Sequence, residues 1–205
     1  SERNGFSGLF NLVAARGSEV CERMLADKRL PLISATGSCR MGRRINDVVG
    51  QRLGRALLEL GGNNAVIVTE DANLDLALPA VLFGAVGTAG QRCTSTRRLI
   101  LQKGIAKKFT DKLVKSYSSV RIGDPLDEAT LMGPLVNTAA IDDMMDALKQ
   151  AREQGGEVLC GGNKLDRPGN FVEPTIVKAN RKMEIWKDET FAPILYIMSY
   201  GSAGS

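Results

Sequence analysis

Short runs of consecutive apolar residues alternate along this chain with longer segments in which apolar residues recur every three or four positions. Short runs are typical of buried strands, and the longer spacing is typical of helices with one buried face. The predicted strands occupy residues 9–13, 30–34, 56–60, 65–68, 98–101, 157–160, 171–177 and 194–198. The predicted helices occupy residues 19–26, 39–53, 74–86, 106–117 and 137–154. This alternation predicts an α/β fold, a mostly parallel sheet with covering helices.

Local signals mark the ends of some of these elements. Ser18 is the predicted N-cap of the first helix, and Gly155 and Gly156 are predicted to close the last one. The tail at 201–205 has the composition of a flexible linker, so it is left out of the fold prediction.

Charge changes this picture little. The 205 residues suffice for one domain or for parts of two, and the net charge is +4. Lysines and arginines are interleaved with acidic residues, which argues against a nucleic-acid partner. The arginine doublets at 43–44 and 97–98 are the only local concentrations of positive charge. We interpret both as solvated surface, with a bound anionic group as the alternative.

Three further composition facts restrict the class of protein. No stretch approaches the ~20 apolar residues that span a bilayer, and the polar start lacks signal-peptide features, so no membrane partner is expected. The cysteines are widely separated, which favours reduced thiols in a cytoplasmic protein. Histidine is absent, so no metal site is expected, and any cysteine nucleophile must use a base other than histidine.

The segment at 36–42 (TGSCRMG) follows a predicted strand and opens a predicted helix. Free backbone N–H groups at such a junction can hold a phosphate. A glycine turn that merely connects strand and helix is the alternative.

Glu59 is a charged residue inside the apolar run 57–60, just before two glycines. Carboxylates are rarely buried without a partner, and a desolvated carboxylate accepts protons readily, as a general base must. The alternative is an edge-strand glutamate that points to water.

Cys93 lies in a loop of small and polar residues, where backbone N–H groups and Arg92 could favour a thiolate. These are typical surroundings of a nucleophile. A structural cysteine is the alternative, and that description fits Cys21 and Cys160 better, because they fall in a predicted helix and a predicted strand. Cys39 is ambiguous, since it lies in the proposed phosphate turn.

Two motifs in order resemble the paired signature of the aldehyde dehydrogenase superfamily: ELGG at 59–62 and, about thirty residues later, GQRC at 90–93. The segment at 36–42 resembles the nucleotide-phosphate turn of this family, and ETFAP at 189–193 resembles its nicotinamide-ribose motif. Within the superfamily, GGNN at 61–64 and GTAGQRCT at 87–94 most resemble the antiquitin branch. The substrate of that branch is α-aminoadipic semialdehyde or its cyclic piperideine-carboxylate form.

The resemblance implies oxidation of this aldehyde to a carboxylate. Cys93 would attack the aldehyde, and Glu59 would activate the water that hydrolyses the resulting thioester. Arg92 would pair with the distal carboxylate of the substrate, which a guanidinium suits.

The resemblance also implies NAD as cofactor, with NADP as an alternative. Gly37, Ser38 and Gly42 would face its phosphates at a helix N-terminus. Glu189 and Phe191 would position the nicotinamide ribose.

The resemblance covers nearly all of residues 5–200 but less than half of a typical subunit, so a family-like fold truncated at both ends is expected. Residues 1–60 would be the C-terminal part of the nucleotide-binding domain, and 61–200 a partial catalytic domain. The oxyanion asparagine and the ribose lysine of the family would lie upstream, so the isolated chain is expected to be inactive. The full-length form would be a homo-oligomer. The alternatives are a non-catalytic binding or structural fragment and a cysteine thioesterase that needs no cofactor.

Overall fold

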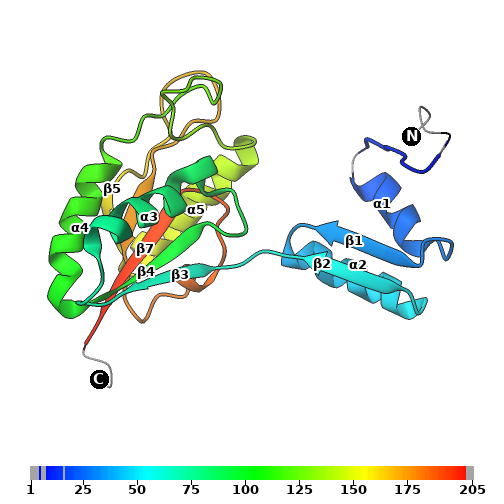
Figure 1. The fold of residues 1–205 in the computed structure, drawn as a ribbon, viewed down its shortest axis with the longest axis horizontal. Helices are drawn as coiled ribbons and strands as arrows, with labels where there is room; N and C mark the ends of the chain where they lie inside the picture. The colour runs from blue at the N-terminus through cyan, green and yellow to red at the C-terminus, as the bar shows by residue number, and fades with distance from the viewer. Residues whose placement is uncertain (1–4, 6–7, 16, 202–205) are drawn as a thin grey trace. The chain divides into compact units, whose positions relative to one another are not determined.

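The computed structural model describes residue 5, residues 8–15 and residues 17–201. The chain divides into two compact units, with the boundary between Gly61 and Gly62 (Figure 1).

The first unit is a small α/β arrangement of two strands and two helices. Its elements are α1 (Gly17–Ala26), β1 (Leu32–Thr36), α2 (Cys39–Gln51) and β2 (Arg55–Glu59). The two strands are parallel, and Thr36 pairs with Glu59 at their carboxyl ends. Both strands alternate between half-buried and exposed residues, so only one face of this sheet is covered.

A compact cluster covers that face. Leu25 of α1 and Ile45 and Val49 of α2 are buried, and the half-buried strand residues pack against them. On the other face, Leu32 and Leu57 are half exposed and share their side of the sheet with Glu59.

The second unit is a larger sheet with helices packed against it. Its elements are β3 (Asn64–Val68), α3 (Leu74–Val86), the short 3-10 helix η2 (Gly87–Gly90), β4 (Thr96–Gln102), α4 (Lys103–Tyr117), α5 (Thr138–Glu153), β5 (Glu157–Cys160), β6 (Thr175–Lys178), the short 3-10 helix η3 (Ile185–Lys187) and β7 (Ile194–Tyr200). The strand order is β3-β4-β7-β6-β5, in which β5 alone runs antiparallel to its neighbour (Figure 1).

The core of this unit lies between the sheet and its helices. β7 is central, and its residues 194–197 are all buried, as expected of a parallel strand covered on both faces. Phe109 and Leu113 of α4 and Met144 and Leu148 of α5 are fully buried in the same cluster. Each such side chain contributes about 1.5–3 kcal/mol through removal from water, which gives the unit a firm platform for the loops that carry polar residues.

The predicted fold class is confirmed, and so are the order and type of nearly all elements. The predicted strand at 9–13 is wrong. Residues 8–15 form no strand, and the side chain of Leu12 is 92% exposed. A strand needs a hydrogen-bonding neighbour, and in the described part of the chain β1 pairs with β2 alone.

Two predicted boundaries are also wrong. The first helix begins at Gly17, so Ser18 lies in its first turn and is not its N-cap. The strand predicted at 171–177 begins only at Thr175, since Pro174 has no N–H to donate to a ladder. Before it, Val172 forms a single isolated bridge with Lys164. Among the helices that the structure describes, none is long and apolar enough to cross a bilayer.

Candidate active site

The loop that carries Cys93 begins with a strained turn. In η2, Thr88 and Ala89 have φ values of 53° and 52°, and Gly90 follows at 69°. Non-glycine residues rarely adopt this left-handed conformation, so the surrounding contacts must hold it in place. A Cβ atom on Gly90 would lie 2.3 Å from the carbonyl oxygen of Ala192, so the loop crosses the segment before β7 at backbone contact.

Hydrogen bonds fix the backbone on both sides of Cys93. Asn64 Nδ2 donates to the Cys93 carbonyl oxygen at 2.6 Å and to the Ser95 carbonyl oxygen at 3.1 Å. The Ser95 backbone N–H donates to the Arg92 carbonyl oxygen at 3.0 Å, and the Arg92 N–H donates to Ser95 Oγ at 3.2 Å. Cys93 itself is exposed. The chain therefore holds an accessible thiol on an ordered backbone.

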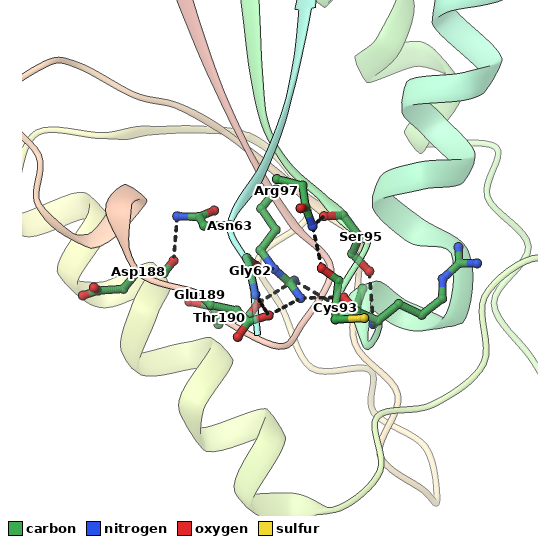
Figure 2. Close-up of polar contacts among 11 residues, drawn as sticks. Gly62, Asn63, Cys93, Ser95, Arg97, Asp188, Glu189 and Thr190 are labelled. Carbon is green, nitrogen blue, oxygen red and sulfur yellow. Dashed lines mark hydrogen bonds and ion pairs between the residues drawn. The ribbon is translucent and has the colours of Figure 1, made fainter. Parts of the chain in front are cut away.

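Arg97, on β4, lies at the centre of the polar contacts beside this loop (Figure 2). Its side chain is only 3% exposed and forms an ion pair with Glu189, at 3.2 Å. The interpretation of the 97–98 doublet as solvated surface is therefore wrong for Arg97. Burial lowers the pKa of its guanidinium, while the charges of Glu189 and Cys93 oppose that change. An arginine remains charged at neutral pH even so.

Glu189 and Phe191 flank this arginine. Glu189 Oε1 accepts from the Gly62 N–H at 3.1 Å as well as from Arg97. The Arg97 guanidinium lies over the Phe191 ring, 5.2 Å from its centroid. Phe191 is 46% exposed, so the ring also presents surface to water.

Two asparagines of the GGNN motif have a structural role that the sequence did not predict. Asn64 holds the Cys93 loop as described above, and Asn63 Nδ2 donates to the carbonyl oxygens of Trp186, at 3.0 Å, and Asp188, at 3.3 Å. Their signals in the sequence are the GGNN motif and their position directly after two glycines at a strand start. Together they tie the start of β3 to the loops around Cys93 and Glu189.

Arg92 turns its guanidinium toward α3. Its Cζ lies 5.3 Å from the centroid of the Phe83 ring, and a Cβ on Gly87 would lie 2.7 Å from its Nη2. Arg92 Nε is buried without a hydrogen-bond partner among the described residues. This donor is therefore unpaired within this part of the chain but closed to solvent.

The first unit holds the other predicted site residues. The Gly37 N–H donates to the Glu59 carbonyl oxygen at 3.0 Å. Ser38 is the N-cap of α2, and its Oγ accepts from the Met41 N–H at 3.2 Å. Gly42 is buried because α2 approaches the chain closely there, and a Cβ on it would lie 2.6 Å from the methyl carbons of Leu60. Glu59 is exposed, as in the alternative of a glutamate that points to water.

The structure thus brings together Cys93, Arg97, Glu189 and Phe191 in the second unit. Separately, it brings together Gly37, Ser38, Gly42 and Glu59 in the first. Among the residues that the structure describes, no group of three acidic, cysteine or histidine side chains could hold a metal ion.

We expect Ser38→Ala to destabilise the first unit by about 0.5–2 kcal/mol, since it removes the acceptor at the N-terminus of α2. Urea unfolding followed by circular dichroism, in a buffer without phosphate, measures this loss. Ser38→Thr keeps the hydroxyl and is the matched control. A Ser38→Ala chain as stable as the unmodified one would show that the cap contributes nothing.

The four thiols are expected to differ in reactivity. Cys21, Cys39 and Cys93 are exposed, so the interpretation of Cys21 as a packed structural cysteine is wrong. Cys160 is half-buried, and burial raises the pKa of its thiol. A raised pKa leaves less thiolate at about pH 8, so iodoacetamide should label Cys93 about tenfold faster than Cys160, measured by peptide mass spectrometry. Equal rates would contradict the burial of Cys160.

Comparison with known proteins gives a consistent picture. Residues 6–203 match the aldehyde dehydrogenase family. The protein described as "Putative aldehyde dehydrogenase family 7 member A1 homolog" from Dictyostelium discoideum is 49% identical over 185 residues, which are 90% of this chain and 36% of that protein. "Alpha-aminoadipic semialdehyde dehydrogenase" from Bos taurus is 44% identical over 200 residues, which are 97% of this chain and 37% of that protein.

Solved structures agree. The crystal structure of betaine aldehyde dehydrogenase from Staphylococcus aureus in complex with NAD+ matches with a TM-score of 0.94 at 31% sequence identity. The match covers 98% of this chain and 41% of that chain. This chain therefore spans about two fifths of the length of the proteins that it matches. Because the family match extends over nearly all of its residues, the chain belongs to the aldehyde dehydrogenase family.

Proposed function

We propose that this chain is the part of an NAD-dependent aldehyde dehydrogenase that carries its nucleophile, Cys93, and its general base, Glu59. The proposed reaction oxidises α-aminoadipic semialdehyde to the carboxylate through a thioester on Cys93. The observation that carries the proposal is an exposed thiol on a loop that is held by backbone contacts and by the buried Arg97, which pairs with Glu189. The relatives named as α-aminoadipic semialdehyde dehydrogenases support the choice of aldehyde.

The chemistry assigns one step to each side chain. The Cys93 thiolate forms a bond from sulfur to the aldehyde carbon, and the carbonyl oxygen takes the negative charge, which gives a hemithioacetal oxyanion. NAD+, when bound, supplies the acceptor for the hydride that leaves this carbon, and a thioester remains on Cys93. Glu59 takes a proton from a water molecule whose oxygen attacks the thioester carbon, the Cys93 thiolate leaves, and the carboxylic acid product releases its proton to water to become the carboxylate. The exposure of Glu59 is compatible with a base that must reach water.

The residues present fit a nicotinamide nucleotide. Within the described residues, the Glu189 carboxylate accepts two hydrogen bonds, and Oε1 accepts both of them. Oε2 accepts none there, so Oε2 is free for a ribose hydroxyl. Its side chain is 24% exposed, which leaves it accessible to a ligand. Gly37 and Ser38 stand at the N-terminus of α2, which favours a phosphate, and Gly42 allows the close packing of that helix. In this proposal Phe191 packs against the ribose.

Arg92 is proposed to bind the distal carboxylate of the substrate. Arg92 is half-buried and forms no ion pair within the described residues, so its charge is not committed to an acidic side chain of this chain. The ring of Phe83 supports the guanidinium from one side and restricts its orientation.

The two units correspond in this proposal to two partial domains. Residues 1–60 would belong to the nucleotide-binding domain and residues 61–200 to the catalytic domain. The isolated chain is proposed to be inactive, because it lacks the upstream oxyanion donor that the family resemblance implies. A cytoplasmic location and a homo-oligomeric full-length form stay predictions.

The test transfers residues 6–203 into the Bos taurus relative in place of the matched segment. We expect this chimera to reduce NAD+ when given α-aminoadipic semialdehyde, whereas the 205-residue chain alone does not. NADP+ in place of NAD+ measures the cofactor preference. Ester hydrolysis by the chimera at an equal rate with and without nucleotide, and no reduction of NAD+, would favour a thioesterase and contradict the proposal.

A further inference from the structure

Arg97 uses every N–H group of its guanidinium. Nε donates to the Gly62 carbonyl oxygen at 3.3 Å. Nη1 donates to the carbonyl oxygens of Gly90, at 3.0 Å, and Thr190, at 2.8 Å. Nη2 donates to the Arg92 carbonyl oxygen at 2.9 Å and to Glu189 Oε1 at 3.2 Å. All five N–H donors of this side chain therefore have an acceptor, which is its full hydrogen-bonding capacity.

These acceptors belong to three segments that are far apart in sequence. Gly62 precedes β3, Gly90 and Arg92 lead into Cys93, and Glu189 and Thr190 precede β7. Four of the five acceptors are backbone carbonyl oxygens. Arg97 therefore fixes the backbone positions of these segments in addition to pairing with the charge of Glu189. Figure 2 shows the Arg97 side chain reaching between the Cys93 loop and the segment of Glu189 and Thr190.

Stability alone is a weak explanation for this arrangement. Burial of the Arg97 guanidinium costs desolvation free energy that its ion pair with the partly exposed Glu189 offsets, so the net stability gained is small, and an apolar side chain could fill the same space. The acceptors of Arg97 lie in the segments that carry the exposed Cys93 thiol and the partly exposed Glu189 carboxylate. The arrangement is better explained by the geometry that Arg97 imposes on these two groups.

The neighbouring arginine makes different contacts. Arg98 donates from Nη2 to the Asn63 carbonyl oxygen at 2.6 Å and lies over the Trp186 ring, 5.4 Å from its centroid. Within the part of the chain that the structure describes, Arg98 makes no hydrogen bond to Gly90 or Arg92, the residues to which Arg97 donates. Arg98 is therefore a matched control of equal charge on the same strand.

We propose that Arg97 is a positioning residue that fixes the Cys93 loop against the Glu189 segment, so that the thiol and this carboxylate keep one relative geometry. The proposal deepens the proposed function and rests on Cys93 being the nucleophile. The Arg97 guanidinium donates to the carbonyl oxygen of the residue before Cys93, and the negative charge of Glu189 partly offsets its positive charge.

Two measurements on the 205-residue chain test this proposal, and neither uses aldehyde or nucleotide. Hydrogen–deuterium exchange reports the order of residues 87–93 and 188–192. The ratio of the alkylation rates with iodoacetate, which is anionic, and iodoacetamide, which is neutral, reports the local charge at Cys93. Cys39, exposed in the first unit, is the internal reference for this ratio.

We expect Arg97→Gln to speed exchange in both segments and to lower the iodoacetate-to-iodoacetamide ratio at Cys93 by about two- to fivefold at low salt, with Cys39 unchanged. Arg97→Lys keeps the positive charge but not the planar guanidinium with its five donors. The alkylation ratio at Cys93 should therefore equal that of the unmodified chain, while exchange in both segments is faster than in the unmodified chain. Arg98→Gln should leave exchange at residues 87–93 unchanged.

If Arg97→Gln does not fold, Arg97→Lys and Glu189→Gln carry the test. Glu189→Gln keeps an amide oxygen for both donors, so exchange should stay slow while the ratio at Cys93 rises by about two- to fivefold. Unchanged exchange in Arg97→Lys, or exchange that rises equally in Arg98→Gln, would overturn the positioning role. Failure here leaves aldehyde oxidation by the chimera untouched, so the two proposals can fail separately.

Discussion

Cys93→Ser should lower aldehyde oxidation by the chimera by at least about 10³-fold, because loss of a covalent nucleophile removes the whole thioester route. A serine hydroxyl stays protonated at neutral pH without an adjacent base, and this chain has no histidine to serve as one. The rate of NAD+ reduction with α-aminoadipic semialdehyde measures the effect.

The control for this variant is Cys160→Ser, which changes a half-buried thiol on β5. It should retain activity apart from a modest loss of stability. Cys93 is exposed, so its replacement by serine should leave thermal unfolding nearly unchanged. Retention of more than a tenth of the activity in Cys93→Ser would remove Cys93 from the role of nucleophile.

Gly90→Ala should destabilise the second unit by roughly 2–6 kcal/mol, through left-handed backbone strain and a clash with backbone. The added methyl would lie 2.3 Å from the Ala192 carbonyl oxygen, and the residue has φ 69°. A backbone atom cannot move aside as a flexible side chain can. Trp186, the one tryptophan of the chain, lies in this unit and reports its unfolding in urea by fluorescence.

Gly133→Ala is the matched control in the same unit. Its added Cβ would meet Pro125 at 3.5 Å, which is ordinary contact, and its φ is not in the left-handed region. We expect a change below about 1 kcal/mol there. Equal unfolding midpoints for Gly90→Ala and Gly133→Ala would mean that the Cys93 loop tolerates a different path.

The order and type of the elements could be predicted because each depends on its own periodicity. The strand at 65–68 and the helix at 74–86 illustrate this, since local pattern and packing agree there. The strand predicted at 9–13 failed because its pairing depends on a neighbour and not on its own apolar residues.

The candidate site was only partly predictable for a similar reason. The predicted roles of Cys93 and Glu189 rest on short motifs, which are local. Arg97 has no such signal, because its burial depends on acceptors at Gly62 and Thr190, 35 and 93 positions away in the sequence. A charged doublet on a strand carries no signal of such partners, and its default interpretation is surface.

Trapping the proposed thioester on Cys93 is a direct test of the roles of Cys93 and Glu59. In the chimera, Glu59→Gln removes the base while leaving the thiol and the nucleotide contacts in place. After addition of α-aminoadipic semialdehyde and NAD+, followed by acid quench, peptide mass spectrometry should find the acyl group of the substrate on Cys93, with one equivalent of reduced nucleotide formed in a burst. No acyl group on Cys93, or turnover at the unmodified rate, would contradict the account.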